Sequence, residues 1–281
     1  MKKLFTLLAL TISFSMNAQV STNSTSPTGT YASAMGNGTT ASGNESTAMG
    51  YDTTASGEAS TAMGYSTTAS AQGSTAMGRE TTASAQSSTA MGYFTTASGD
   101  YSTAMGLFST ASDYASTVIG QYNSSGSSAT SAGAFSTSNT AFVIGNGTNN
   151  SNKSDAFKVM FNGDTTVSND LTVSGDVVVS SDARLKSNIV SLGSTLSRLL
   201  LIDGKSYEMK GKQKIGVLAQ DIKEVFPELV TEDDNEMLAV NYQGLVPVLI
   251  NALKEQESKF EKQQAEIEEL KEMVNQLISS K

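Results

Sequence analysis

Ser181 and Lys186 stand five residues apart where the chain changes composition, in the stretch VVVSSDARLKSNIV of residues 177–190. Ser, Thr, Gly and Ala dominate before it, and Leu, Ile, Lys and Glu become frequent after it. A serine nucleophile needs a base, and lysine is the remaining ordinary candidate because the chain has no histidine. Such a lysine must lose its proton, which requires burial to lower its pKa from about 10.4. The spacing alone is weak evidence, because a turn-capping serine and a solvated lysine would look the same.

The residue types that are absent exclude several kinds of chemistry. The 281 residues include no cysteine and no histidine, which excludes disulfides, thiol catalysis, Ser-His-Asp triads and histidine-based zinc hydrolysis. The net charge is −9, and Arg79 is the only basic residue between Tyr31 and Asn150, so we expect no nucleic-acid partner. The aspartates of NGDTTVSND do not have calcium-loop spacing, and we predict no metal and no cofactor.

The N-terminal residues MKKLFTLLALTISFSMNAQV predict a signal peptide over residues 1–18. Two lysines precede an apolar run that is too short to span a bilayer, and small residues follow around Ala18. Residues 19–30 read as a linker. We therefore expect an exported chain, at the cell surface or extracellular, whose mature form has no membrane span.

A fourteen-residue repeat follows. Successive copies read STAMGYDTTASGEA from Ser46, STAMGYSTTASAQG from Ser60, STAMGRETTASAQS from Ser74 and STAMGYFTTASGDY from Ser88. The Met-Gly pair recurs in strict phase at Met35, Met49, Met63, Met77, Met91 and Met105. This period suits two short strands and two tight turns, which form one coil of a β-solenoid.

The strand pattern predicts which side chains share a face of each coil. Thr47 and Met49 fall on one face and Ala48 on the other, because side chains alternate along a strand. Gly50 permits a turn with positive φ, and Gly57 marks the second turn. Such a coil buries very little, so we expect the Met or Ala ladder to be covered by copies of the same chain.

The repeat STAMG followed by TTASG resembles the head repeat of trimeric autotransporter adhesins over about residues 31–122. The resemblance implies a head at residues 31–125 that forms a left-handed, trimeric β-roll. Met and Thr stand where that family usually has Ile and Val, which softens the core.

The remaining chain divides into three predicted parts. Short alternating runs separated by turn signals predict a β-rich neck over residues 126–180. Residues 181–248 read as a small α/β domain. Residues 249–281 carry a heptad seam that predicts a parallel coiled coil, or alternatively a lone amphipathic helix. The a positions are Leu253, Phe260, Ile267 and Val274, and the d positions are Leu249, Gln256, Gln263, Leu270 and Leu277.

The motifs SDARLKSNI, IGVLAQDIKEVFPELV and YQGLVPVLINALKE resemble, in order and spacing, the self-cleaving C-terminal intramolecular chaperone of phage tailspikes, tail fibres and endosialidases. The resemblance implies a trimerising domain that cuts itself off once, with Ser181 as nucleophile and Lys186 as base. The cut would fall between Ser180 and Ser181. Asp182 and Arg184 would orient the loop, or form an ion pair with no catalytic role.

The sequence thus favours an exported, homotrimeric fibre with an adhesin-like head and a self-releasing, single-turnover serine endopeptidase domain. A second hypothesis is a structural trimer that is never cut and keeps its C-terminal region as a permanent clamp. A third is an ice- or surface-binding solenoid that uses paired threonines such as Thr53-Thr54 and Thr67-Thr68. The sequence does not identify what the head binds: its ligand would be a cell-surface molecule or a glycan, and aromatic residues such as Tyr51, Tyr65, Tyr93 and Phe94 would touch a glycan or nothing at all.

Overall fold

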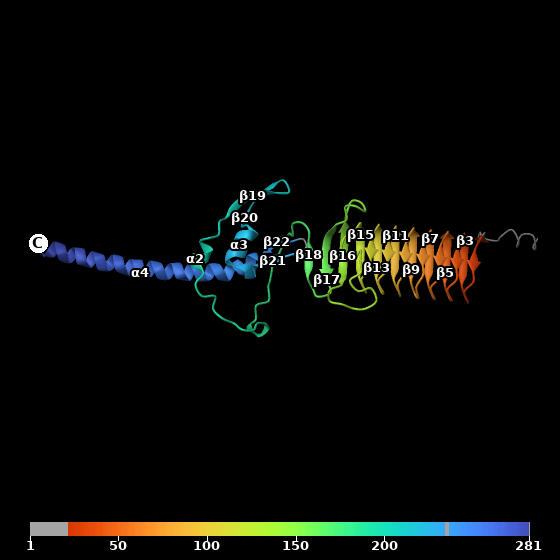
Figure 1. Ribbon diagram of the computed structural model, residues 1–281, viewed down its shortest axis with the longest axis horizontal. Coiled ribbons are helices and arrows are strands. Elements are labelled where there is room, and N and C mark those ends of the chain that lie inside the picture. Colours follow the sequence, from red (N-terminus) through yellow and green to blue (C-terminus); the bar gives the residue numbers. More distant parts are fainter. Residues whose placement is uncertain (1–21, 234–235, 281) are drawn as a thin grey trace, which may run out of the picture. The chain divides into compact units, whose positions relative to one another are not determined.

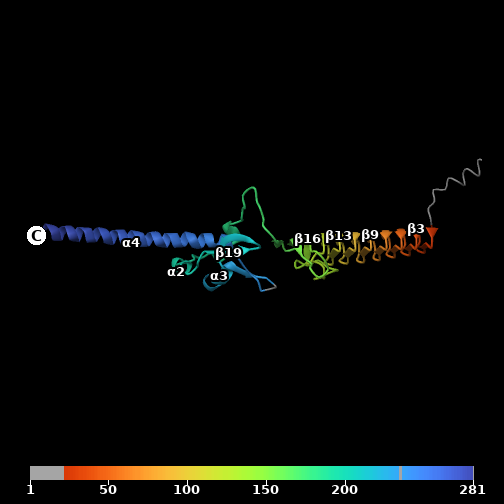
Figure 2. The same cartoon turned by 90° about the horizontal axis from the view of Figure 1, so that it is seen from above.

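The computed structural model describes residues 22–233 and 236–280, so the predicted signal peptide lies outside the described residues. Figures 1 and 2 show the chain from two sides. It divides into two compact units after Val177, and each unit is described by itself.

The first unit is a β-solenoid, as the repeat predicts, with one long and one short strand in each regular coil (Figure 1). Within the described residues, β1 (Thr22–Asn23) and the long strands belong to an 11-stranded sheet, and the short strands form a 7-stranded sheet. The long strands are β3 (Ser33–Asn37), β5 (Thr47–Tyr51), β7 (Thr61–Tyr65), β9 (Thr75–Arg79), β11 (Thr89–Tyr93), β13 (Thr103–Leu107) and β15 (Thr117–Gln121). The short strands are β2 (Ser26–Pro27), β4 (Thr40–Ala41), β6 (Thr54–Ala55), β8 (Thr68–Ala69), β10 (Thr82–Ala83), β12 (Thr96–Ala97) and β14 (Thr110–Ala111).

Because the repeat has constant length, each residue stacks on its equivalent in the next coil. Met49 pairs with Met63, and Ala48 with Ala62, in a parallel register. Ala48 and Ala55 are completely buried inside the coil, whereas Met49 points outward and is half-buried. The solenoid begins earlier than the sequence predicts, because β1 and β2, in the predicted linker, pair with β3 and β4.

The two turns of each coil differ in what they demand of the chain. Gly50 has φ of 122°, and a Cβ added there would lie 2.0 Å from the carbonyl oxygen of Gly64. At the second turn, which the sequence places at Gly57, the residue with positive φ is Ala59, at 52°. This position accepts a side chain because it has room for one: at the equivalent Gly73, the nearest atom to an added Cβ would be the Ser87 hydroxyl, at 3.2 Å.

The threonine pairs do not form two exposed rows. Thr53, Thr67, Thr81 and Thr95 are fully buried inside the solenoid, and only the second threonine of each pair lies on the outer face. The hydroxyl oxygens of these four buried threonines have no hydrogen-bond partner among the described residues. The paired outer array assumed for ice binding is therefore absent from the described part of the head.

The solenoid continues past the predicted head boundary. The Asn123 side chain accepts a hydrogen bond from the Thr110 amide at 2.8 Å and donates one to its carbonyl at 2.9 Å, so it takes the place of a further short strand. β16 (Thr140–Asn146) then stacks in parallel on β15, and β17 (Asp155–Met160) and β18 (Thr165–Val167) follow in antiparallel pairing. The rest of the predicted neck, residues 168–180, has no secondary structure, and Val178 is 88% exposed.

The second unit has short elements that pack on the first turns of a long helix, α4 (Leu245–Ser279). Their core is the buried cluster of Ile222, Phe226 and Val248. Pro247 lies in the first turn of α4, where its missing amide proton costs nothing. The other elements are η1 (Ala183–Leu185), α2 (Leu196–Leu199), β19 (Lys205–Met209), β20 (Lys212–Gly216), α3 (Ala219–Val225), η2 (Pro227–Leu229), β21 (Val230–Glu232), β22 (Leu238–Val240) and η3 (Tyr242–Gly244).

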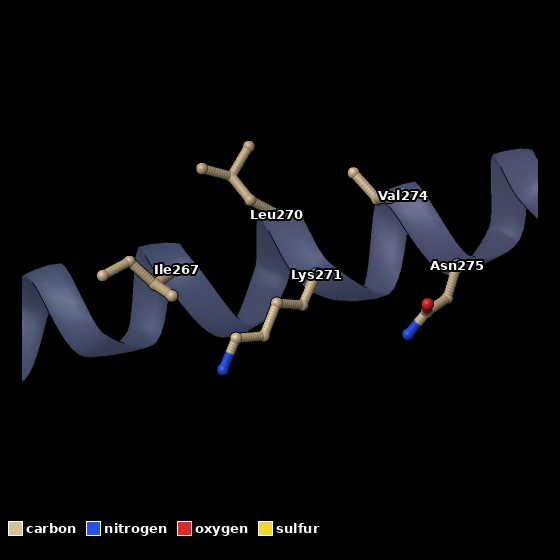
Figure 3. Close-up of a pocket in the computed structure, with 5 residues that line it drawn as sticks. All are labelled: Ile267, Leu270, Lys271, Val274 and Asn275. Carbon is tan, nitrogen blue, oxygen red and sulfur yellow. The ribbon is translucent and has the colours of Figure 1, made fainter.

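Beyond the small core, α4 runs on as a helix whose apolar side chains are uncovered. Every residue from Gln256 to Ser280 is exposed in the single chain. Leu253 is 71% exposed and Leu277 is 68% exposed, although both occupy core positions of the heptad pattern. Figure 3 shows Leu270 and Val274 projecting from the same side of the helix. With Ile267, Lys271 and Asn275 they line an open groove of about 480 Å³.

Candidate functional site

The structure brings the two predicted catalytic side chains together. The Lys186 ammonium Nζ donates a hydrogen bond to the Ser181 hydroxyl Oγ over 2.6 Å. The contact joins residues at the two ends of the short turn η1, at the start of the second unit. A base within hydrogen-bond reach of a hydroxyl is the geometry that an activated serine requires.

Hydrogen bonds within the turn explain why the chain folds back at this point. The Leu185 amide donates to the Asp182 carbonyl, and the Lys186 amide donates to the Ala183 carbonyl, each at 3.1 Å. Asp182 and Lys186, which flank the turn, both have extended backbones, with ψ of 135° and 144°. The single turn thus reverses an otherwise extended strand of chain and places Lys186 over Ser181.

Asp182 and Arg184 form the ion pair that was one of the two predicted roles. Arg184 Nε and Nη2 donate to the two Asp182 carboxylate oxygens at 3.0 and 2.7 Å, in a bidentate fork. The side-chain bond from Arg184 lowers the pKa of Asp182, helped by the Arg184 backbone amide. The same contact raises the pKa of Arg184. Asp182 therefore stays ionised and accepts hydrogen bonds, so it does not serve as a proton donor near neutral pH.

In the single chain this site is open to solvent. Every residue from Ser180 to Val190 is exposed, including Ser181 and Lys186. The apolar side chains around the turn are uncovered as well, with Leu185 73% and Ile189 67% exposed. The geometry of a dyad is therefore present in the single chain without the burial that a lysine base requires.

A second polar cluster in this unit was missed by the sequence reasoning. The segment GSTLSRLLLI predicts a helix capped by Ser194 or Thr195, but the cap of α2 comes from Glu255, on α4. The Ser194 hydroxyl donates to Glu255 Oε2 at 2.6 Å, and the backbone amides of Thr195 and Leu196 donate to Oε1. These bonds, the one from Ser194 foremost, lower the pKa of Glu255. The Thr195 hydroxyl donates to the Val248 carbonyl at 3.0 Å and lies 3.4 Å from Glu255 Oε1.

The head aromatics predicted to touch a ligand form stacks along one turn of the solenoid. The Tyr51 and Tyr65 rings lie 5.0 Å apart and nearly parallel. The Arg79 guanidinium lies over the Tyr65 ring and over the Tyr93 ring, at 5.3 and 5.2 Å from their centroids. Tyr51 and Tyr65 thus cover one face of each other and remain 50% and 45% exposed, whereas Tyr93 and Phe94 meet edge to face.

No helix in the described part of the chain combines the length and hydrophobicity needed to cross a bilayer.

Two known families match the chain, one in each of its two structural units. Residues 28–53, 55–81, 83–109 and 97–123 match the YadA head domain repeat. Residues 181–231 match a peptidase family described as the chaperone of endosialidase, and the match begins at Ser181. No curated protein matches the chain. Both resemblances predicted from the motifs are thereby confirmed: the chain carries YadA-type head repeats followed by a segment similar to the chaperone of endosialidase.

Proposed function

We propose that the chain is an exported, homotrimeric fibre whose C-terminal domain gathers three copies and then releases itself by cutting between Ser180 and Ser181. The observation that carries the cleavage is the 2.6 Å contact between Lys186 Nζ and Ser181 Oγ, at the first residue of the chaperone match. The head would act as an adhesin, with a cell-surface molecule or a glycan as its ligand.

Uncovered apolar surface in both units supports assembly. The head has a ladder of half-buried methionines along its outer face, from Met35 to Met105. Helix α4 exposes an apolar seam formed by its a and d residues. In water, this exposed surface favours packing of the helix against copies of itself. A coiled coil that joins three chains raises the effective concentration of the three heads and holds their registers together.

The proposed reaction is an acyl shift followed by hydrolysis. Neutral Lys186 takes the proton from the Ser181 hydroxyl, and Oγ attacks the carbonyl carbon of Ser180. The bond from that carbon to the Ser181 nitrogen breaks, and the nitrogen receives the proton from Lys186. Water then hydrolyses the resulting ester, which leaves a carboxylate on Ser180 and a free amine and hydroxyl on Ser181.

Assembly would supply the burial that the dyad lacks in the single chain. Three copies that cover Leu185 and Ile189 would also shield Lys186 from water and favour its neutral form. The dyad would then act only after assembly, and cutting would make the folded fibre hard to unfold again.

Intact mass spectrometry of the secreted chain tests this proposal. The wild type should give two fragments divided between Ser180 and Ser181, while Ser181→Ala and Lys186→Ala should each stay whole. Ser187→Ala, one residue beyond the dyad, is the matched control and should be cut. An intact wild type that light scattering shows to be a folded trimer would refute self-cleavage.

A permanent clamp is the second candidate, and the exposure of Lys186 favours it. In that case the domain would gather the chains by the same helix but never cut. The same experiment separates the two functions, because the clamp predicts one intact mass for the wild type and for all three variants.

A further inference from the structure

One side chain caps the turn between Ser181 and Lys186. Asp182 Oδ1 accepts a hydrogen bond from the Arg184 backbone amide at 2.9 Å, which makes Asp182 the N-cap of η1. We infer that Asp182 is a positioning residue for self-cleavage, which acts by holding the turn that brings Lys186 Nζ onto Ser181 Oγ. The inference rests on the proposed function.

Few backbone hydrogen bonds besides the cap maintain this turn. A three-residue 3-10 helix is a poor structure by itself, because few hydrogen bonds offset the loss of backbone freedom. The turn has no buried residue. Its backbone amides donate three hydrogen bonds, two to backbone carbonyls and one to the Asp182 carboxylate, so loss of the cap removes one of these three.

The consequence for the dyad follows from the connectivity. Ser181 directly precedes Asp182, and Lys186 directly follows Leu185, so the angles of this one turn set the distance between Oγ and Nζ. If the turn opens, the lysine is carried away with the chain. A base that spends less time within reach of the hydroxyl lowers the cleavage rate in proportion.

Arg184 has a different and weaker part. Its side chain is 88% exposed, and its guanidinium pairs with the Asp182 carboxylate. The fork fixes the orientation of the carboxylate so that Oδ1 faces the backbone amide. Water can replace Arg184 as a hydrogen-bond donor to the Asp182 carboxylate. Water does not replace that carboxylate as the cap, because it is not attached to the chain at residue 182. Arg184 thus supports the cap, and Asp182 forms it.

The test follows the rate of cutting during refolding of the denatured full-length chain, with fragments separated by gel electrophoresis. Asp182→Ala should slow cleavage by about tenfold, the size expected for loss of an N-cap. Asp182→Asn keeps the acceptor oxygen without the charge and should stay within about threefold of the wild type. Arg184→Gln should fall between them. The pH dependence of the rate should be unchanged in Asp182→Asn.

The two possible failures of this experiment are distinguishable. If the wild type is never cut, the proposed function fails. If the wild type is cut and Asp182→Ala is cut at the same rate, only the positioning role fails. Equal slowing by Asp182→Ala and Asp182→Asn, or a shifted pH profile in Asp182→Asn, would overturn capping in favour of a role for the charge.

A separate control experiment tests whether chains that lack Asp182 still assemble. Light scattering on Asp182→Ala combined with Ser181→Ala, which is uncut by design, reports whether the chains still gather. If this variant fails to assemble, Asp182→Ser provides the second test, because serine is a good N-cap that lacks a carboxylate. Cleavage restored by serine supports the cap, and continued loss of cleavage in an assembled Asp182→Ser chain contradicts it.

Discussion

Two glycines of the same coil differ in how much space the next coil leaves for a side chain. Gly64 has φ of 128°, and a Cβ there would lie 1.9 Å from the carbonyl oxygen of Gly78, in the next coil. Gly73 has φ of 64°, and its added Cβ would meet only the flexible Ser87 hydroxyl, at 3.2 Å. Other coils already place Ala59 and Ser87 at the second position. The first glycine is needed for close approach of two backbones, and the second is replaceable.

We therefore predict that Gly64→Ala and Gly73→Ala differ sharply in stability. Gly64→Ala should lower the free energy of unfolding of the head by about 3 kcal/mol or more, because both the backbone angle and the neighbouring coil resist it. Gly73→Ala should change it by about 1 kcal/mol or less. Thermal unfolding followed by circular dichroism measures both. Similar losses in the two variants would contradict this account of the turns.

The residues of the dyad could be chosen from the sequence, whereas Glu255 could not. Ser181 and Lys186 are close in the chain and sit in a recognisable motif, so local sequence was sufficient to select them. The partner of Glu255 is the start of α2, about sixty residues away, and only the packing of α2 on α4 brings them together. Nothing in the sequence distinguishes this glutamate from the other charged residues of the helix.

At the scale of elements, Glu255 connects α4 to the N-terminus of α2. Its lowered pKa means that the folded domain holds the carboxylate form more tightly than the unfolded chain does. The stabilisation is therefore present above the ordinary value of 4.5 and is lost as the pH falls through the lowered folded value.

A pH series on Glu255→Gln tests this contact. At neutral pH the variant should melt at a lower temperature than the wild type, and the difference should shrink as the pH falls below about 4.5. Glu257→Gln, two residues further along the same helix, is the control and should melt like the wild type at neutral pH. A difference that stays constant down to acid pH would rule out the carboxylate as the source.

The predicted elements agree with the structure where the pattern is local and periodic. The fourteen-residue phase fixed the strands of the head, and the heptad predicted the long helix at α4. The stretch DLTVSGDVVV, in contrast, has the alternation of a strand but forms none in one chain. A strand needs a neighbour for its backbone hydrogen bonds, and the sequence does not say whether that neighbour belongs to the same chain.

At the scale of the whole molecule, self-release predicts an asymmetry between folding before and after the cut. Uncut Ser181→Ala chains should regain the trimeric state after dilution from denaturant, because each head stays joined to its gathering helix. Heads that were already cut should recover poorly under the same conditions, since three free chains must find their register unaided. Light scattering after refolding measures both, and equal recovery would contradict a folding role for the C-terminal domain.

The constant register of the coils also bears on how such a head can change length. Each coil offers the next one the same strands, the same glycine and the same buried alanines, so removal of one repeat joins two surfaces that already match. Duplication or loss of a fourteen-residue unit in the gene would shift the tip by about 4.8 Å and leave both ends of the solenoid as they were. The length of the head can therefore change in steps of one coil, while the strands, turns and core of the other coils stay the same.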